Sequence, residues 1–370
     1  MNRHLHIVCL DAPWPADYGG AIDMFYKIKA LSKAGIRIHL HYFQYNDREI
    51  TDDLNQLCES VEAYPRKTAR EGLRGHQPYI VASRNNEALL DNLNRDDYPV
   101  LLEGIHCTGM VSQIRKGKKI MVRVHNLESA YYRNLAKAER SWIKKFYFRR
   151  ESRLLEKYEK TLPQDVFYAS INHDDLPHFG TALNSFHLPA FIPFQHIKSE
   201  TGIGNFCLYH GNLSVPENEK AALWLLQHVF SKIRVPFVIA GKKPSKRLEK
   251  MAHLCQHTCL VADPKPQEMD DLVRKAHINI LPAFSTTGVK LKLLHALYRG
   301  RHCVVNPEMT SGTGLEAACH TGKTADALAS IVAQLHNQPF TEEEIKLRER
   351  ILEPVFNNDR NAAKIIQYLY

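Results

Sequence analysis

Several common sequence signatures are missing from this chain of 370 residues. No run of 18 or more apolar residues is present, which excludes the usual membrane-spanning helix, and no signal-peptide pattern is found. The chain opens directly into an apolar strand-like run, His6–Leu10, so we expect a cytoplasmic protein. The eight cysteines are scattered, several of them in apolar strand-like runs. They indicate reduced core residues rather than a disulfide framework.

The charge balance is basic, with 49 Lys and Arg against 40 Asp and Glu and a formal net charge of +9. A basic chain suits three kinds of partner: nucleic acid, an anionic membrane, or phosphorylated small molecules. No zinc-finger, helix-turn-helix or RNA-recognition signature accompanies the charge. We therefore expect no nucleic-acid partner.

The length exceeds that of a typical single core, which predicts two domains. Short apolar strand-like segments alternate with helical segments in both halves, and this pattern predicts an α/β fold with doubly wound parallel sheets. We expect an N-terminal domain at 1–188, a Pro-containing linker at 189–196 and a C-terminal domain at 197–355. A last helix within 356–370 is expected to pack back toward the N-terminal domain. Two such halves predict a cleft at their junction.

A loop that contains Gly19 and Gly20 follows the first expected strand. Glycines where a helix begins let the backbone approach a ligand closely. The loop lacks the GxGxxG pattern, so a dinucleotide fingerprint is not supported. Glycines that merely form a turn are the alternative interpretation.

Two polar clusters follow expected strands, at residues 103–106 and 125–128. In doubly wound sheets, ligands bind beyond the carboxyl ends of the strands. His125 stands one residue past a strand end, where it suits an acid, a base or a hydrogen-bond donor. The alternative is a capping or core histidine.

The segment 281–315 predicts a strand, a small-residue turn, a helix over 289–299 and a second strand. A helix N-terminus preceded by glycine and hydroxyl residues offers unpaired N–H groups and a partial positive charge, which suit a phosphate. Lys290 and Lys292 add cations where the helix dipole disfavours them, and this suggests that an anion offsets the cost. Lys292, His295 and Arg299 share one helix face. The alternative is an ordinary amphipathic helix with a solvated basic stripe.

A long basic helix is predicted over 139–160, with Trp142 and other aromatics among lysines and arginines. Cations interleaved with aromatics can lie on an anionic bilayer, which would place the protein at the inner face of the membrane. The alternative is that the aromatics face the core and the cations face water. Farther along, His253, Cys255, His257 and Cys259 alternate, but their spacing matches no common zinc pattern, so we expect no metal site.

These motifs resemble retaining glycosyltransferases of the GT-B fold, in the family-4-like group that includes bacterial mannosyl- and glucosyltransferases of polysaccharide and glycolipid assembly. The resemblance covers nearly the whole chain. It is most specific in VRVHNLE (122–128), LYHGNLSVPEN (208–218), VIAGKK (238–243) and the segment 281–315. The resemblance implies two Rossmann-like domains facing across a cleft. It also implies transfer of a hexose from a UDP- or GDP-linked sugar to a glycan or lipid-linked acceptor, with retention and without a metal or other cofactor.

The resemblance also assigns residues. The donor should bind in the C-terminal half, with the diphosphate also touched by the glycines of the first loop. The expected donor-binding residues are Gly19, Gly20, Asn212, Lys242, Thr287, Gly288, Lys290 and His295. The expected catalytic residues are His125 and Lys292. The expected acceptor-binding residues are Asp17, Tyr18, His106, Asn126 and Glu128.

The chain departs from the family pattern at important positions. The Glu-x7-Glu signature is replaced by Thr287 and His295, and Asn212 and Asn218 stand where an arginine and a lysine are expected. A histidine can still bond to one ribose hydroxyl, and a threonine can donate to phosphate or sugar. A catalytically silent GT-B protein that binds a partner or glycan is therefore the alternative to an active transferase.

Overall fold

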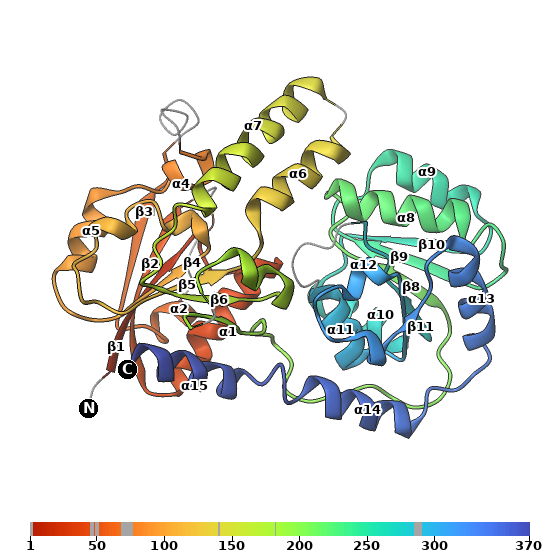
Figure 1. Cartoon of the computed structure of the whole chain (residues 1–370). Coiled ribbons are helices and arrows are strands. Elements are labelled where there is room, and N and C mark those ends of the chain that lie inside the picture. Colours follow the sequence, from red (N-terminus) through yellow and green to blue (C-terminus); the bar gives the residue numbers. More distant parts are fainter. Residues whose placement is uncertain are drawn as a thin grey trace. The chain divides into compact units, whose positions relative to one another are not determined.

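The computed structural model describes residues 3–44, 48, 52–67, 77–139, 141–181, 183–284 and 291–370. The chain divides into two compact units. Unit 1 comprises Met1–Pro193 with Phe356–Tyr370, and unit 2 comprises Phe194–Val355. Figure 1 shows a sheet with flanking helices in each unit.

Unit 1 is built on a seven-stranded sheet in the order β3-β2-β1-β4-β5-β6-β7, and every pair is parallel. The strands are β1 (Arg3–Cys9), β2 (Ile36–Gln44), β3 (Ser60–Pro65), β4 (Val100–Glu103), β5 (Ile120–Val124), β6 (Phe167–Ser170) and β7 (Ser185–His187). The α-helices are α1 (Gly19–Lys33), α2 (Asp52–Asn55), α4 (Tyr79–Ala82), α5 (Glu87–Asn94), α6 (Glu128–Ala138), α7 (Trp142–Glu159) and α15 (Asn358–Leu369). β4 and β5 are buried at every position, as strands covered on both faces are.

Two apolar clusters cover the two faces of this sheet. Successive residues of a strand point to opposite faces, and Ile7 belongs to one cluster while Val8 belongs to the other. The first cluster includes Ile28 of α1 and Ile365 of α15, and Figure 1 shows these two helices side by side. The second cluster includes Leu155 of α7. Residues at the far end of the chain thus complete the core of unit 1.

Unit 2 is built on a six-stranded parallel sheet in the order β10-β9-β8-β11-β12-β13. Its strands are β8 (Cys207–His210), β9 (Phe237–Gly241), β10 (Thr258–Ala262), β11 (Ile278–Ile280), β12 (His302–Val305) and β13 (His320–Thr321). Its α-helices are α8 (Pro216–His228), α9 (Lys246–Leu254), α10 (Pro266–Lys275), α11 (Leu291–Arg299), α12 (Pro307–Thr310), α13 (Ala325–Leu335) and α14 (Glu342–Leu352). A β-carbon at Gly241 would lie 1.8 Å from the Gly211 carbonyl oxygen, so the loops after β8 and β9 meet where only glycine fits.

The predicted α/β class with two doubly wound parallel sheets is confirmed. The predicted helix over 289–299 is observed from Leu291, and its first two residues lie outside the described ranges. The predicted basic helix begins at Trp142 rather than 139, because Ser141 and Glu139 have extended backbone and separate α7 from α6. None of the helices in the described ranges combines the length and apolar character that a membrane crossing requires.

Candidate active site

His125 rests on a buried carboxylate at the carboxyl ends of β4 and β5. Its Nε2 lies 2.9 Å from Oε2 of Glu103, the last residue of β4. The other oxygen of Glu103 accepts a hydrogen bond of 2.7 Å from Lys27 of α1. Glu103 and Lys27 are fully buried, and the His125 side chain is 10% exposed. The imidazole is therefore held in one orientation with one edge open to solvent.

Asp23 extends this network to the opposite side of Lys27. Its carboxylate accepts hydrogen bonds from Lys27 at 2.9 Å and from Arg123 of β5 at 3.0 Å. It also accepts one from the backbone N–H of Phe191 at 2.7 Å. Burial acts to raise the pKa of Asp23, but Arg123 and Lys27 outweigh burial and hold that pKa well below its usual range. Two carboxylates and two cations thus compensate one another behind His125.

Asp23, Glu103 and His125 bring possible metal ligands within 4.8 Å of one another. The surrounding contacts argue against an ion there. Both oxygens of Glu103 and both oxygens of Asp23 already accept hydrogen bonds, and Lys27 occupies the space between the two carboxylates. A metal ion would have to displace a buried ammonium group, so this cluster fits ion pairing better than metal binding.

His106 lies near His125, so the two predicted polar clusters meet. The pKa of His106 is lowered well below its usual value by burial first, and then by Arg84 and His125. Its Nδ1 has no hydrogen-bond partner among the described residues. A β-carbon at Gly104 would lie 2.8 Å from that nitrogen, and Gly104 has a φ of +82°, so a glycine is required there. His106 is thus a neutral imidazole whose Nδ1 is buried against Gly104.

Asn126 and Glu128 lie at the start of α6. The Asn126 amide donates to Oε1 of Glu128 at 3.3 Å, and Glu128 is 4% exposed. Burial is the main cause that raises the pKa of Glu128 to about 7. This carboxyl group can therefore gain or lose a proton near neutral pH.

The expected acceptor residues of the first loop are held by Arg48. Arg48 donates to Asp17 Oδ1 at 3.0 Å and stacks 5.1 Å above the Tyr18 ring. The Tyr18 hydroxyl in turn donates to Asp11 Oδ2 at 3.2 Å. Gly19 is the first residue of α1, and a β-carbon at Gly20 would contact the Tyr18 ring at 3.0 Å. Gly20 thus makes room for the Tyr18 ring. Packing against Tyr18 is therefore a second reason for a glycine here, besides close approach of the backbone to a ligand.

In unit 2, Lys292 stands in the first turn of α11 beside the end of β8. Its ammonium group donates to Asn218 Oδ1 at 2.9 Å and to the Tyr209 hydroxyl at 3.3 Å, and it lies 4.9 Å above the Tyr209 ring. Asn218 also donates from Nδ2 to the Asn212 carbonyl oxygen at 2.9 Å. Asn218 thus forms a cradle for Lys292 together with Tyr209, and Asn212 holds Asn218 in place; the two asparagines stand where basic residues are expected.

His295 has a different environment from Lys292 although both lie on α11. Its Nε2 lies 3.0 Å from Asp270 Oδ1, and its ring stacks on Phe194 at 5.3 Å. The bond from His295 is the main cause of the lowered pKa of Asp270, to which Arg299 also contributes. The predicted shared face therefore holds for His295 and Arg299 around Asp270.

Four expected donor positions remain, one after β9 and three just before α11. Lys242 follows β9 directly, its side chain is exposed, and its carbonyl oxygen accepts a hydrogen bond of 3.0 Å from Leu213 N–H. Thr287, Gly288 and Lys290 lie outside the described residues. Their assignments remain predictions.

Several functional groups were missed by sequence reasoning. Asp23, Lys27 and Arg123 escaped it because they stand in apolar segments that predict core packing. An acid and a base four residues apart on a buried helix face, and an arginine inside a buried strand, were the available signals. His210 was also missed; its pKa is lowered well below the usual value by burial, then by His295 and Lys292.

Comparisons with known proteins bear on both units. Residues 204–338 match the family model described as Glycosyl transferases group 1. A Klebsiella pneumoniae protein described as an uncharacterized 44.6 kDa protein in the cps region is 28% identical over 329 residues, which cover 83% of this chain and 84% of that protein.

Two solved structures match almost the whole chain. The sucrose-phosphate synthase of Thermosynechococcus elongatus has a TM-score of 0.71 at 14% identity, covering 99% of this chain and 98% of that one. A trehalose-phosphate synthase of Burkholderia xenovorans has a TM-score of 0.61 at 12% identity, with both chains fully covered. The predicted GT-B fold is confirmed, and the family match over unit 2 supports a glycosyltransferase.

Proposed function

We propose that this chain transfers a hexose from a UDP- or GDP-linked sugar to a glycan or lipid-linked acceptor, with retention of configuration and without a metal. The observation that carries the proposal is Lys292, held over Tyr209 and Asn218 within the segment that matches the glycosyltransferase model. The relative in the cps region favours a role in cell-surface polysaccharide synthesis.

In this proposal unit 2 binds the nucleotide-sugar. The leaving diphosphate gathers negative charge as the glycosidic bond breaks, and fixed positive groups stabilise it most where they need no rearrangement. Lys292 is fixed by its cradle, Lys242 supplies a second cation, and Lys290 with the turn at Gly288 completes the predicted set. His295, held by Asp270, takes the place of the ribose-binding carboxylate, and Thr287 that of the carboxylate near the sugar.

Unit 1 binds the acceptor in the proposal. His125, held by Glu103, contacts the transferred sugar or the attacking hydroxyl. His106, Asn126 and Glu128 lie beside it and supply hydrogen-bonding groups, with Asp17 and Tyr18 farther along the first loop. The leaving phosphate accepts the acceptor's proton on the same face, so no pair of catalytic carboxylates is required, unlike in glycosidases.

A thermal-shift panel tests the donor site. UDP, GDP, ADP, CMP and their common sugar conjugates are each added at millimolar concentration to wild type, Lys292→Ala and Lys250→Ala. A ligand at 100 times its Kd adds about 2.7 kcal/mol of stability, which raises Tm by several degrees. We expect one nucleotide to stabilise wild type and the Lys250→Ala control, whose exposed lysine lies on α9, and to stabilise Lys292→Ala much less. An equal shift in Lys292→Ala would contradict the diphosphate role of this lysine.

The second candidate function is a catalytically silent GT-B protein that binds a partner or a glycan. The observation that favours it is the hydrogen bond between His295 and Asp270, since this bond occupies Nε2 and leaves the imidazole only one ring nitrogen for a ribose hydroxyl. A panel in which no nucleotide shifts Tm would favour this candidate over the transferase.

We also propose that the start of α7 docks on an anionic membrane surface, which places the protein at the cytoplasmic face. Trp142, Ile143 and Phe146 are 79%, 62% and 70% exposed, although the core-facing alternative would bury them. Trp142 and Phe146 are one helical turn apart and share a face. Exposed Lys144 and Arg149 supply the charge that anionic headgroups attract.

Vesicle co-sedimentation tests the membrane proposal. We expect wild type to bind phosphatidylglycerol vesicles and to bind phosphatidylcholine vesicles far less. The double variant Trp142→Ala/Phe146→Ala should lose most of this binding, whereas Leu254→Ala, which removes a 69% exposed leucine from α9, should keep it. Equal binding of the double variant would contradict the proposal.

A further inference from the structure

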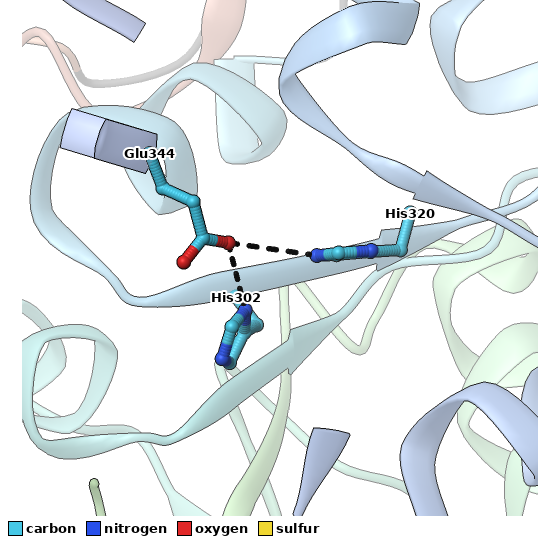
Figure 2. A group of neighbouring side chains, drawn as sticks. All are labelled: His302, His320 and Glu344. Carbon is cyan, nitrogen blue, oxygen red and sulfur yellow. Dashed lines mark ion pairs between the residues drawn. The ribbon is translucent and has the colours of Figure 1, made fainter. Parts of the chain in front are cut away.

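A second cluster of metal-ligand side chains lies in unit 2, formed by His302, His320 and Glu344 (Figure 2). Nδ1 of His302 lies 3.2 Å from Glu344 Oε1, and Nε2 of His320 lies 3.8 Å from the same oxygen. The three ligand atoms all lie within 4.8 Å of one another. They come from β12, β13 and α14, so three separate segments converge on one point.

The orientation of His302 leaves a buried lone pair aimed at a carboxylate. Its Nε2 lies 3.0 Å from the Gln338 carbonyl oxygen, which can only accept, so the Nε2 atom carries the proton. Nδ1 is then a bare acceptor; it is buried and lacks a hydrogen-bond partner among the described residues, because the contact with Glu344 lacks hydrogen-bond geometry.

Glu344 is oriented just as firmly. It is the third residue of α14 and forms a capping box with Thr341, whose backbone N–H donates to Glu344 Oε2 at 2.9 Å. Oε2 is therefore used by the helix cap, and Oε1 is directed at the two histidines. Histidines that bind metals usually donate their second N–H to a carbonyl or carboxylate, and metal-bound carboxylates are themselves hydrogen-bonded. His302 and Glu344 both have such support.

We propose that His302 Nδ1, His320 Nε2 and Glu344 Oε1 bind one zinc ion, with water as the fourth ligand. Zinc bonds of about 2.0–2.1 Å in a tetrahedron place neighbouring ligands about 3.3 Å apart, close to the 3.2 Å and 3.8 Å observed. A cavity of about 150 Å³ borders the cluster and is lined in part by His320, Glu344 and Cys319. The side chains of His320 and Glu344 are 40% and 30% exposed, so an ion can reach them from solvent.

The position of the cluster assigns the ion a structural role. His302 and His320 are the first residues of β12 and β13, so they lie toward the amino ends of these strands, whereas ligands of such sheets bind at the carboxyl ends. β13 has only two residues and pairs with β12 alone. A zinc ion would fasten this edge strand and α14 to the buried β12 and would stabilise unit 2 without taking part in glycosyl transfer.

Metal binding by the whole chain tests the proposal. Chelator-treated protein is titrated with zinc against a chromophoric competitor, and cobalt is added separately to record the visible bands of a tetrahedral site. We expect one ion per chain and a Tm increase of about 5 °C at saturating zinc. His320→Gln and Glu344→Gln should each weaken zinc binding at least about 10-fold.

The variants separate binding from folding. Glutamine also serves at the third position of a capping box, so Glu344→Gln keeps the α14 cap while removing the charged ligand. His257→Gln removes an exposed histidine of the same unit and should leave zinc affinity unchanged. Tight binding that survives in Glu344→Gln, or no stoichiometric binding by wild type, would overturn the site. Neither result depends on whether the protein transfers a sugar.

Discussion

The two units prepare their candidate sites in opposite ways. In unit 1, His125 rests on four buried charged groups that compensate one another, so its support is closed to solvent. In unit 2, Lys292 donates hydrogen bonds to an amide oxygen and to a phenol. The first arrangement fixes the imidazole ring through contacts with charged groups. The second holds an ammonium group through hydrogen bonds to uncharged oxygens.

The largest expected difference between the units concerns stability. Asp23→Ala leaves Arg123 and Lys27 buried with one carboxylate between them, and breaking a buried ion pair in this way costs about 3–5 kcal/mol. Asp270→Ala removes a carboxylate whose side chain is 35% exposed in its pairs with His295 and Arg299, so about 1 kcal/mol or less is expected. Urea unfolding of both variants measures the contrast. Similar losses would show that the two sites are built alike.

A second difference concerns pH. The pKa of Glu128 rises from an ordinary 4.5 to about 7 in the folded chain. Between these values the folded chain keeps a proton that the unfolded chain has lost, so this group's contribution to stability falls by about 3 kcal/mol as pH rises through that window. Relative to wild type, the free energy of unfolding of Glu128→Gln should therefore increase by about 3 kcal/mol between pH 4.5 and pH 8.

Urea unfolding at a series of pH values measures that gain. The control is Glu156→Gln, whose side chain is 49% exposed, and its difference from wild type should stay within about 0.5 kcal/mol. If the free energy of unfolding of wild type and that of Glu128→Gln changed with pH in parallel, Glu128 would titrate as an ordinary carboxyl group.

A third difference concerns the turnover rate. His125→Ala should lower kcat by about 100-fold, the lower end of the range for a positioned acid, base or donor, while the KM for the nucleotide-sugar changes little. Steady-state kinetics with the donor identified by the thermal-shift panel provide the measurement. A loss confined to donor KM would move His125 out of the reaction centre and into donor binding.

The smallest predicted effect falls on His295. His295→Ala should raise donor KM by about 5-fold, since one hydrogen bond contributes about 1 kcal/mol, and should leave kcat nearly unchanged. The same kinetic series measures it. An unchanged donor KM would mean that His295 serves only its pair with Asp270.

Sequence reasoning reached the fold because apolar strand-like runs alternate with helices throughout the chain. It also placed His125 at a strand end, where the structure has it. The ion network behind His125 could not be predicted, since Asp23 and Arg123 are distant in sequence and each stands in an apolar segment. The ligands of the proposed zinc site could not be predicted for the same reason. His253 and His257 alternate with cysteines in the sequence, yet they belong to no ligand cluster in the described ranges. The ligands at residues 302, 320 and 344, in contrast, are far apart in the sequence.

The return of α15 to unit 1 has a consequence for how the protein is made. Ile365 and Leu369 belong to the apolar cluster that also contains residues of β1 and α1, so that cluster stays incomplete until α15 has left the ribosome. Unit 2 is made wholly in between and has all of its strands before then. We therefore expect unit 2 to complete its fold first, the reverse of the usual order in which the N-terminal domain folds first during synthesis. Until α15 is made, unit 1 exposes the apolar face that α15 covers.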